Sequence, residues 1–306
     1  MAITKTIRPG LIQMRVTNLD ESVAFYRDVL GLDVVGKTSD GRVMFKTFDE
    51  FDHHSVVLRA APESGFDYVA FKVTDAETLE ELKAATEEFG YPVDIASDEQ
   101  PGYGKRYGFT LCTGHRIELY AEVDMAENIP MLLNPDPWID PPRGMKAQRF
   151  DHLLLYGPNI GEAVRYFTEV LGMFYPEYCN TPDGKPFAYW LTGGNKAHDI
   201  AFVEYEKPNT IHHHAFYLED WNAIGHAADL IGKNRVKRDV GPTRHAITRG
   251  QTIYFFEPSG NRIETYAGGY AAYPDNPKRQ WTVDELGRGF FYYEGELIPS
   301  FLEVVT

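Results

Sequence analysis

The sequence predicts an α+β protein made of two homologous halves, each built from two β-α-β-β-β units. The first observation is an internal repeat whose partners stay at nearly constant spacing. The second is that strand-like and helix-like patterns recur in the same order within each half. Three pairs of segments resemble one another: Phe25–Gly31 and Tyr166–Gly172, Ala70–Val73 and Ala215–Leu218, and Gly114–Tyr120 and Gly260–Tyr266.

The first unit begins with an alternating run, Ile12–Val16, that predicts a strand. We expect Asp20 to cap the helix that follows, because a short side-chain oxygen at that position can accept a backbone N–H. Gly31 predicts its end, since glycine favours the left-handed conformation found after helices. Two short runs, Val43–Thr47 and Ser55–Leu58, read as further strands.

The second unit repeats this order. Tyr68–Val73 predicts a strand, and a helix is expected from Asp75 to about residue 89. Strands are expected at Gly108–Cys112 and Arg116–Tyr120. The same reading applies to the second half, which gives four units in the whole chain.

The proline-rich segment Asn134–Arg143 predicts the hinge between the halves. We therefore expect an N-terminal domain at 1–133, a C-terminal domain at 147–273 and a tail at 274–306. Within the tail, Gly289–Tyr293 is rich in glycine and aromatic residues, and we expect it to pack back onto a domain.

Composition restricts the possible partners. The 306 residues carry a formal charge of −15, which disfavours nucleic acid and anionic membrane surfaces and favours small organic molecules. Neither a signal-peptide pattern nor a long apolar run is present, so we expect a cytoplasmic protein. The two cysteines, Cys112 and Cys179, lie in different halves and read as free thiols.

The two halves differ where a metal could bind. In the second half the repeat aligns His152, His213 and Glu264 on three successive predicted strands. The equivalent residues of the first half read as Gln13, Tyr68 and Glu118, so only the carboxylate occurs twice. A single histidine in a strand is usually a packed or surface residue, and the match of all three favours a metal site.

Two histidines and one carboxylate on one face of an ion leave other positions open for ligands. This set is typical of non-haem Fe(II) oxygenases, although catalytic zinc uses it as well. No H-E-x-x-H helix is present, which disfavours a zinc protease. Strand alternation allows either His213, or His212 with His214, to face the site. The repeat favours His213.

Three further residues are candidates for proton chemistry. His198 lies at the start of a predicted strand, His245 in a loop-like run before another, and Tyr254 ten residues before Glu264. Taken alone, each has a simple structural reading as a surface histidine, a loop histidine and a core tyrosine.

The chain resembles the type I extradiol dioxygenases of the vicinal-oxygen-chelate superfamily, and most closely the catechol 2,3-dioxygenases. The resemblance covers essentially the whole chain. Its most specific segments are Phe150–Leu153, Lys196–Asp199, Gly241–His245, and Thr252–Arg262 followed by Glu264.

The resemblance implies barrels of mixed sheet, a metal-free first domain and Fe(II) held by His152, His213 and Glu264. It also implies that His198 is an acid–base group beside bound dioxygen, and that His245 and Tyr254 hydrogen-bond the bound diol. The implied reaction opens catechol with dioxygen to 2-hydroxymuconate semialdehyde in aromatic hydrocarbon catabolism, in a homotetramer.

Two departures from the family pattern are His214, where an apolar residue is expected, and Arg249, where some relatives have histidine. One alternative reading is an extradiol enzyme for another diol, of the homoprotocatechuate or biphenyl type, with Mn(II) as the alternative metal. Another is a metal-free ligand-binding module of the same superfamily.

Overall fold

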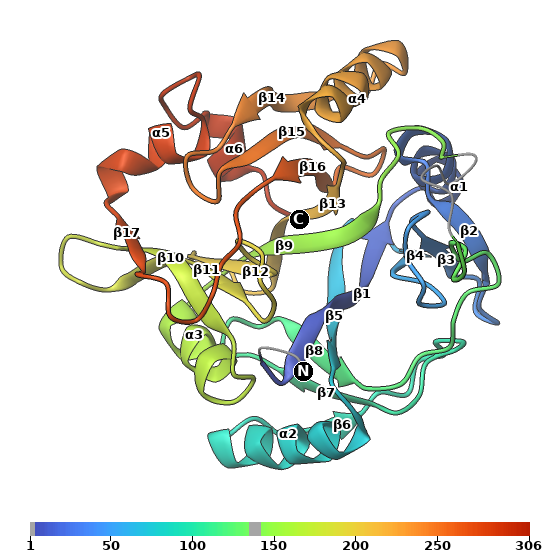
Figure 1. Ribbon diagram of the computed structural model, residues 1–306, viewed down its shortest axis with the longest axis horizontal. Helices are drawn as coiled ribbons and strands as arrows, with labels where there is room; N and C mark the ends of the chain where they lie inside the picture. The colour runs from blue at the N-terminus through green and yellow to red at the C-terminus, as the bar shows by residue number, and fades with distance from the viewer. Residues whose placement is uncertain (1–3, 135–141) are drawn as a thin grey trace.

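The computed structural model describes residues 4–134 and 142–306 and confirms the predicted order of four β-α-β-β-β units (Figure 1). The first unit comprises β1 Thr6–Val16, α1 Leu19–Ala24, the π-helical turn η1 Phe25–Leu30, β2 Asp33–Lys37, β3 Val43–Lys46 and β4 Val56–Ala60. The second comprises β5 Gly65–Val73, α2 Ala76–Phe89, β6 Asp94–Ile95, β7 Arg106–Thr110 and β8 Arg116–Tyr120.

The second half repeats this order. Its third unit comprises β9 Arg149–Gly157, α3 Ile160–Glu169, β10 Phe174–Asn180, β11 Pro186–Thr192 and β12 Ile200–Glu204. The fourth comprises β13 Thr210–Tyr217, α4 Trp221–Lys233, β14 Arg238–Arg244, β15 Gly250–Phe256 and β16 Arg262–Gly268. The tail adds β17 Arg279–Trp281, the 3-10 turn η2 Val283–Glu285, α5 Leu286–Phe290 and α6 Pro299–Glu303.

Each half forms one mixed sheet. The eight-stranded sheet has the order β2-β3-β4-β1-β5-β8-β7-β6, and the nine-stranded sheet has the order β14-β15-β16-β13-β9-β12-β11-β10-β17. In both, an antiparallel central pair is flanked by parallel neighbours: β1–β5 in the first sheet and β9–β13 in the second. The central strands of the two sheets lie side by side in Figure 1.

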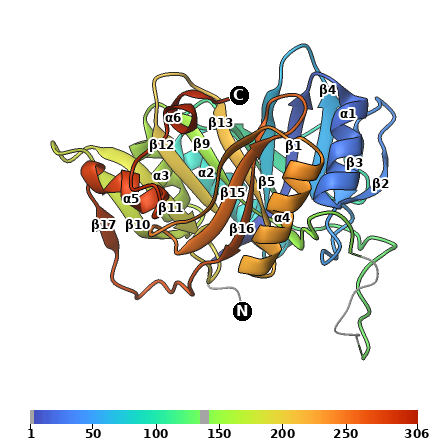
Figure 2. The ribbon, with the colours of Figure 1, turned by 90° about the horizontal axis from the view of Figure 1, so that it is seen from above.

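One face of the second sheet packs into the hydrophobic core, and the other holds the candidate site. Leu153 and Leu155 of β9 belong to the large core that also contains Phe167 of α3 and Ile224 of α4. In Figure 2, α4 lies over β15 and β16 on this face. Because successive side chains of a strand alternate, His152 and Leu154 project to the opposite, inner face. The inner face therefore holds the candidate site.

Three local predictions are corrected. Asn18, and not Asp20, caps the first helix, because the Asn18 side chain accepts a hydrogen bond from the Glu21 N–H. Asp20 lies inside the first turn, where its carboxylate interacts favourably with the helix dipole. The strand expected at Gly108–Cys112 begins two residues earlier, at Arg106. The loop-like run 241–248 that contains His245 is strand in its first half, because β14 extends to Arg244, and is loop from His245 onward.

The tail packs against the second half. β17 adds to the sheet beside β10, and the Gly289 carbonyl accepts hydrogen bonds from the Ala246 and Ile247 N–H groups. Most of the predicted hinge, residues 135–141, lies outside the described residues. Within the described ranges, no helix is both long and apolar enough to cross a membrane.

Candidate metal centre

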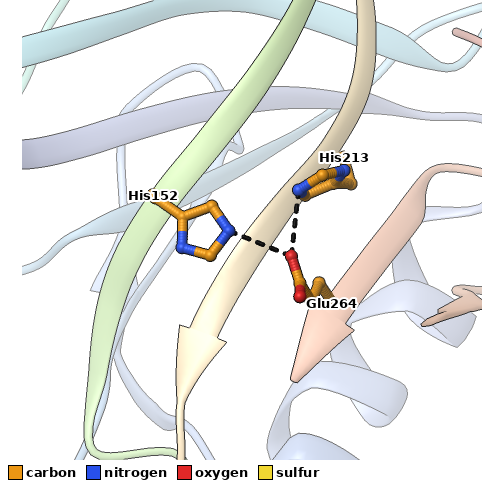
Figure 3. Close-up of side chains that lie close together, drawn as sticks. All are labelled: His152, His213 and Glu264. Atoms are coloured by element: carbon orange, nitrogen blue, oxygen red, sulfur yellow. Dashed lines mark hydrogen bonds and ion pairs between the residues drawn. The ribbon is translucent and has the colours of Figure 1, made fainter. Parts of the chain in front are cut away.

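Three adjacent strands bring His152, His213 and Glu264 together (Figure 3). His152 lies on β9, His213 on β13 and Glu264 on β16, which are neighbours in the sheet. The Nε2 atoms of His152 and His213 lie 2.9 and 3.0 Å from Glu264 Oε2. All three side chains are buried.

The spacing of these atoms fits a single metal ion. Two donors at right angles, each ~2.1 Å from an ion, lie about 3 Å apart. The two nitrogen–oxygen distances match that separation, and the three donors together cover one face of the ion. Imidazole together with carboxylate suits a divalent transition-series metal such as Fe(II), Mn(II) or Zn(II).

A carboxylate fixes the tautomer of His152. Its Nδ1 lies 2.8 Å from Asp151 Oδ2, and an ionised carboxylate can only accept. Nδ1 therefore donates, which leaves the lone pair of a neutral ring on Nε2, facing the site. Asp151 is itself paired with Arg149 and Lys196, and these cations help to hold its pKa far below the usual value in spite of its burial.

A series of hydrogen bonds between uncharged groups fixes the tautomer of His213. The Phe301 carbonyl accepts from His212 Nε2–H at 2.6 Å, so His212 Nδ1 carries the lone pair of a neutral ring. This atom lies 2.7 Å from His213 Nδ1, which must then donate. The lone pair of His213 remains on Nε2, toward Glu264. A carbonyl of helix α6 thus orients the site through two imidazoles.

The run of three histidines is resolved by a β-bulge between Ile211 and His213, which leaves all three side chains buried. Of the three, His213 joins the cluster with His152 and Glu264. His214 faces the other side, where its Nε2 lies 2.8 Å from the Tyr26 hydroxyl. That contact with the first half explains a histidine at a position expected to be apolar.

Glu264 is held in its charged form. Burial opposes its ionisation, but the close imidazoles of His152, His213 and His245 outweigh this and lower its pKa well below the usual value. Its second oxygen, Oε1, accepts from the Thr252 hydroxyl at 2.6 Å. Thr252 lies two residues before Tyr254 on the same strand, β15, and no motif of the sequence pointed to it.

The three proton-chemistry candidates line the same cavity as the cluster. The His198 ring lies 4.0 Å from that of His152, and burial, then the charges of His152 and Lys196, lower the pKa of His198 well below its usual value. His198 is therefore a neutral imidazole at neutral pH.

On the other side of the cavity, His245 Nε2 lies 2.9 Å from the Tyr254 hydroxyl. The Phe290 carbonyl accepts from His245 Nδ1, so the lone pair of a neutral His245 points toward Tyr254. Burial, together with nearby Glu264, raises the pKa of Tyr254 well above its usual value, which keeps the phenol protonated.

The cavity is narrow, with a free volume of about 20 Å³. This space is of the order of a single water molecule and is too small for an aromatic ring. Its walls include apolar side chains from the body of the domain and from the tail: Leu154, Trp190, Ala201, Ile247 and Phe290. Entry of an aromatic molecule therefore requires the wall to move.

The first half corrects one predicted equivalence. In the strand ladders, Ala70 pairs with Leu11 as Ala215 pairs with His152, so Leu11 and not Gln13 matches His152. Both ladders carry a bulge just before this residue, which a comparison of sequences alone does not reveal. The matches of Tyr68 to His213 and Glu118 to Glu264 agree with the ladders.

Two family models match the chain. The Glyoxalase/Bleomycin resistance protein/Dioxygenase superfamily matches residues 149–265, and the catechol 2,3-dioxygenase-like N-terminal domain matches residues 66–124. The first range contains all six candidate site residues.

Relatives cover almost the whole chain. A metapyrocatechase of Pseudomonas sp. (strain CF600) is 41% identical over 98% of each chain. A manganese-dependent 2,3-dihydroxybiphenyl 1,2-dioxygenase of Geobacillus genomosp. 3 is 30% identical over 95% of each chain.

Solved structures agree with this relationship. The 2,3-dioxygenase LapB from Pseudomonas sp. KL28 superposes with a TM-score of 0.90 at 46% identity, covering 92% of this chain and 99% of that one. Homoprotocatechuate 2,3-dioxygenase from Brevibacterium fuscum, in complex with 3,4-dihydroxyphenylacetate, gives 0.87 at 26% identity, covering 99% and 93%. The chain belongs to the extradiol ring-cleaving dioxygenases of the glyoxalase/bleomycin resistance/dioxygenase superfamily.

Proposed function

We propose that the protein cleaves catechol with dioxygen beside one hydroxyl-bearing carbon, giving 2-hydroxymuconate semialdehyde, at one Fe(II) held by His152, His213 and Glu264. The observation that supports this most is the buried cluster of two imidazole Nε2 atoms around one carboxylate oxygen. The reaction balances without another reactant, because both atoms of dioxygen enter the product. The 41% identical metapyrocatechase supports the choice of catechol.

The metal, when bound, would hold the diol and dioxygen next to each other and accept charge from the diol oxygen. The residues around it would handle protons. The lone pair of His245 faces the Tyr254 hydroxyl, so this pair is suited to accept a proton from a diol hydroxyl and to orient the resulting anion. Tyr254 acts as a hydrogen-bond donor because it stays protonated.

His198 would act on the opposite side of the cavity. A neutral imidazole can take up a proton and release it later, which suits the acid–base role in breaking the O–O bond. We expect His198→Gln to keep its metal and to lower kcat about 10²- to 10⁴-fold. Steady-state rates with metal analysis check this, and a near-normal rate would remove His198 from the mechanism.

Manganese is the second candidate metal. The ligand set suits Mn(II) as well, and a relative that is 30% identical is named as manganese-dependent and acts on 2,3-dihydroxybiphenyl. Apoprotein reconstituted anaerobically with one equivalent of Fe(II) or Mn(II) separates the two. Fe(II) protein should consume one dioxygen per catechol and form a yellow product, and it should prefer catechol to 2,3-dihydroxybiphenyl. A colourless diacid, or activity with Mn(II) alone, would contradict the proposal.

We also infer a division of labour along the chain: residues 1–133 as a structural domain, 147–273 as the catalytic domain and 274–306 as a covering tail. The separate sheets formed by β1–β8 and β9–β17 support this. A homotetramer is part of the same proposal, supported by exposed Met131, Leu132 and Leu133. Light scattering should give about four times the 34.8 kDa chain mass.

A further inference from the structure

Thr248 combines two features that are unusual for a buried threonine. Its hydroxyl oxygen is buried and has no hydrogen-bond partner among the described residues. Its backbone has φ of +59°, a left-handed conformation in which a β-branched residue is a genuine outlier. Glycine would adopt this backbone without strain and would bury no hydroxyl. The choice of threonine therefore points to a use for the side chain.

The surroundings hold Thr248 in this conformation. The buried carboxylate of Glu177 on β10 accepts from the Thr248 N–H at 3.0 Å. The same carboxylate accepts from the Tyr270 hydroxyl and from Trp281 Nε1, both at 2.6 Å. Glu177 thus ties the loop before β15 to the tail. Strain that a structure retains in this way is concentrated at functional sites.

Thr248 also lines the candidate active cavity. Among the residues around that cavity, it is the one whose buried side-chain oxygen lacks a partner within the described ranges. The Tyr266 hydroxyl donates to the Thr248 carbonyl at 3.4 Å, and the Tyr266 ring lies edge-on to His152 and His198. Tyr266 therefore links Thr248 to the part of the cavity that holds His152 and His198.

We propose that Thr248 is a substrate-binding residue whose hydroxyl hydrogen-bonds an oxygen atom of the bound diol, either a diol oxygen or an oxygen of a polar ring substituent. This inference rests on the proposed function. Bringing an acceptor to a buried, unpartnered hydroxyl recovers a hydrogen bond that the free protein lacks. Apart from the metal cluster, His198, His245 and Tyr254, the other wall residues are apolar or aromatic, so the Thr248 hydroxyl also helps to fix the orientation of the ring.

Thr248→Val tests the role of the hydroxyl, because valine keeps the shape and the branched Cβ. Thr248→Ser keeps the hydroxyl. The matched control is Thr265→Val: Thr265 is also buried with an unpartnered hydroxyl, but it does not line the cavity. All proteins are loaded with one Fe(II) anaerobically, and diol binding is measured by equilibrium titration without dioxygen.

We expect Thr248→Val to bind catechol about 3- to 10-fold more weakly, with full metal content and no loss of thermal stability. Thr248→Ser and Thr265→Val should bind within about twofold of the unchanged protein. A second titration with 3,4-dihydroxyphenylacetate distinguishes the acceptors: weakening with both diols assigns a diol oxygen, and weakening with this diol alone assigns the substituent.

Unchanged binding of both diols by Thr248→Val would overturn the inference. Equal weakening in Thr248→Ser or in Thr265→Val would overturn it too, because the effect would then follow shape or stability and not this hydroxyl. Failure of the proposed function is distinguishable, since in that case the unchanged protein itself would bind neither diol.

Discussion

A buried carboxylate occupies the same position in both sheets, but its neighbours are arginines in the first and histidines in the second. Glu118 of the first half is paired with Arg106 Nε at 2.9 Å and with Arg116 Nε at 3.1 Å. Glu264 of the second half faces the two imidazoles of His152 and His213. Both carboxylates are about 1% exposed, so each needs compensation for its charge.

The difference comes from the neighbouring strand. Arg106 pairs with Tyr120 in the first sheet as Thr252 pairs with Tyr266 in the second, so Arg106 and Thr252 occupy equivalent positions. Arg106 brings a positive charge to Glu118. Thr252 gives Glu264 a hydrogen bond without a charge. The first half thus supplies its own cation, while in the proposed function the second half leaves that place to a metal ion.

The largest effect should come from giving the first half the residue of the second. Arg106→Thr removes the one fully buried cation beside Glu118, which then keeps only the partly exposed Arg116, and breaking such a buried pair costs about 3–5 kcal/mol of unfolding free energy. Urea denaturation measures this loss, and metal analysis of the folded protein should still give the value of the unchanged protein. If stability is unaffected, Arg106 is not the internal cation that the comparison requires.

A smaller effect should follow from breaking the hydrogen bonds that link His213 through His212 to the Phe301 carbonyl. His212→Phe removes the acceptor for His213 Nδ1–H, and loss of such outer partners typically weakens metal binding 10- to 100-fold. Phenylalanine suits the aromatic surroundings, since His212 packs against Tyr156 and Phe301. Competition with a coloured chelator gives the affinity.

His214→Phe is the matched control for this variant. It replaces the other neighbour of His213, which bonds Tyr26 and not the cluster. We expect it to lower stability and to leave metal affinity within about threefold of the unchanged protein. If both variants weaken metal binding equally, the effect belongs to the strand and not to the hydrogen-bond chain.

The smallest effect is the pH dependence of stability that Asp98 of the first half should contribute. Burial opposes ionisation of Asp98, but Arg106 and the hydrogen bond from Tyr68 outweigh it and lower the pKa of Asp98. A lowered folded-state pKa contributes stability that is present above the unfolded value of ~3.9 and is lost as pH falls through the folded value.

The stability difference between the unchanged protein and Asp98→Asn should therefore shrink by on the order of 1 kcal/mol between about pH 6 and pH 3. Urea unfolding at several pH values measures this difference. A difference that stays constant over this range would show that Asp98 does not contribute through its charge.

The repeat made the four-unit fold and the metal candidates predictable, because helix ends and strand patterns recur at nearly constant spacing. Residue-level register was harder to predict. Leu11 and Gln13 lie on the same face of β1. Only the bulge between Pro9 and Leu11 determines that Leu11 is the equivalent of His152. Asn18 and Asp20 are both good caps, so the sequence alone did not distinguish them.

Contacts between distant parts of the chain lay beyond the sequence. Glu177 reaches Thr248 across 71 residues, and the Phe301 carbonyl reaches His212 across 89. Neither pairing follows from periodicity or spacing. The contrast between Arg106 and Thr252, unlike these pairings, was available in the sequence. The repeat alone places the two residues at equivalent positions, two residues before Gly108 and Tyr254.

Metal stoichiometry tests the comparison most directly. Protein isolated without dioxygen and loaded with excess Fe(II), then freed of unbound ion, is compared with Glu264→Gln and Glu118→Gln, each measured on its folded fraction. We expect one ion per chain in the unchanged protein, none in Glu264→Gln and one in Glu118→Gln. Two ions in the unchanged protein, or an ion retained by Glu264→Gln, would contradict a single metal site in the second half.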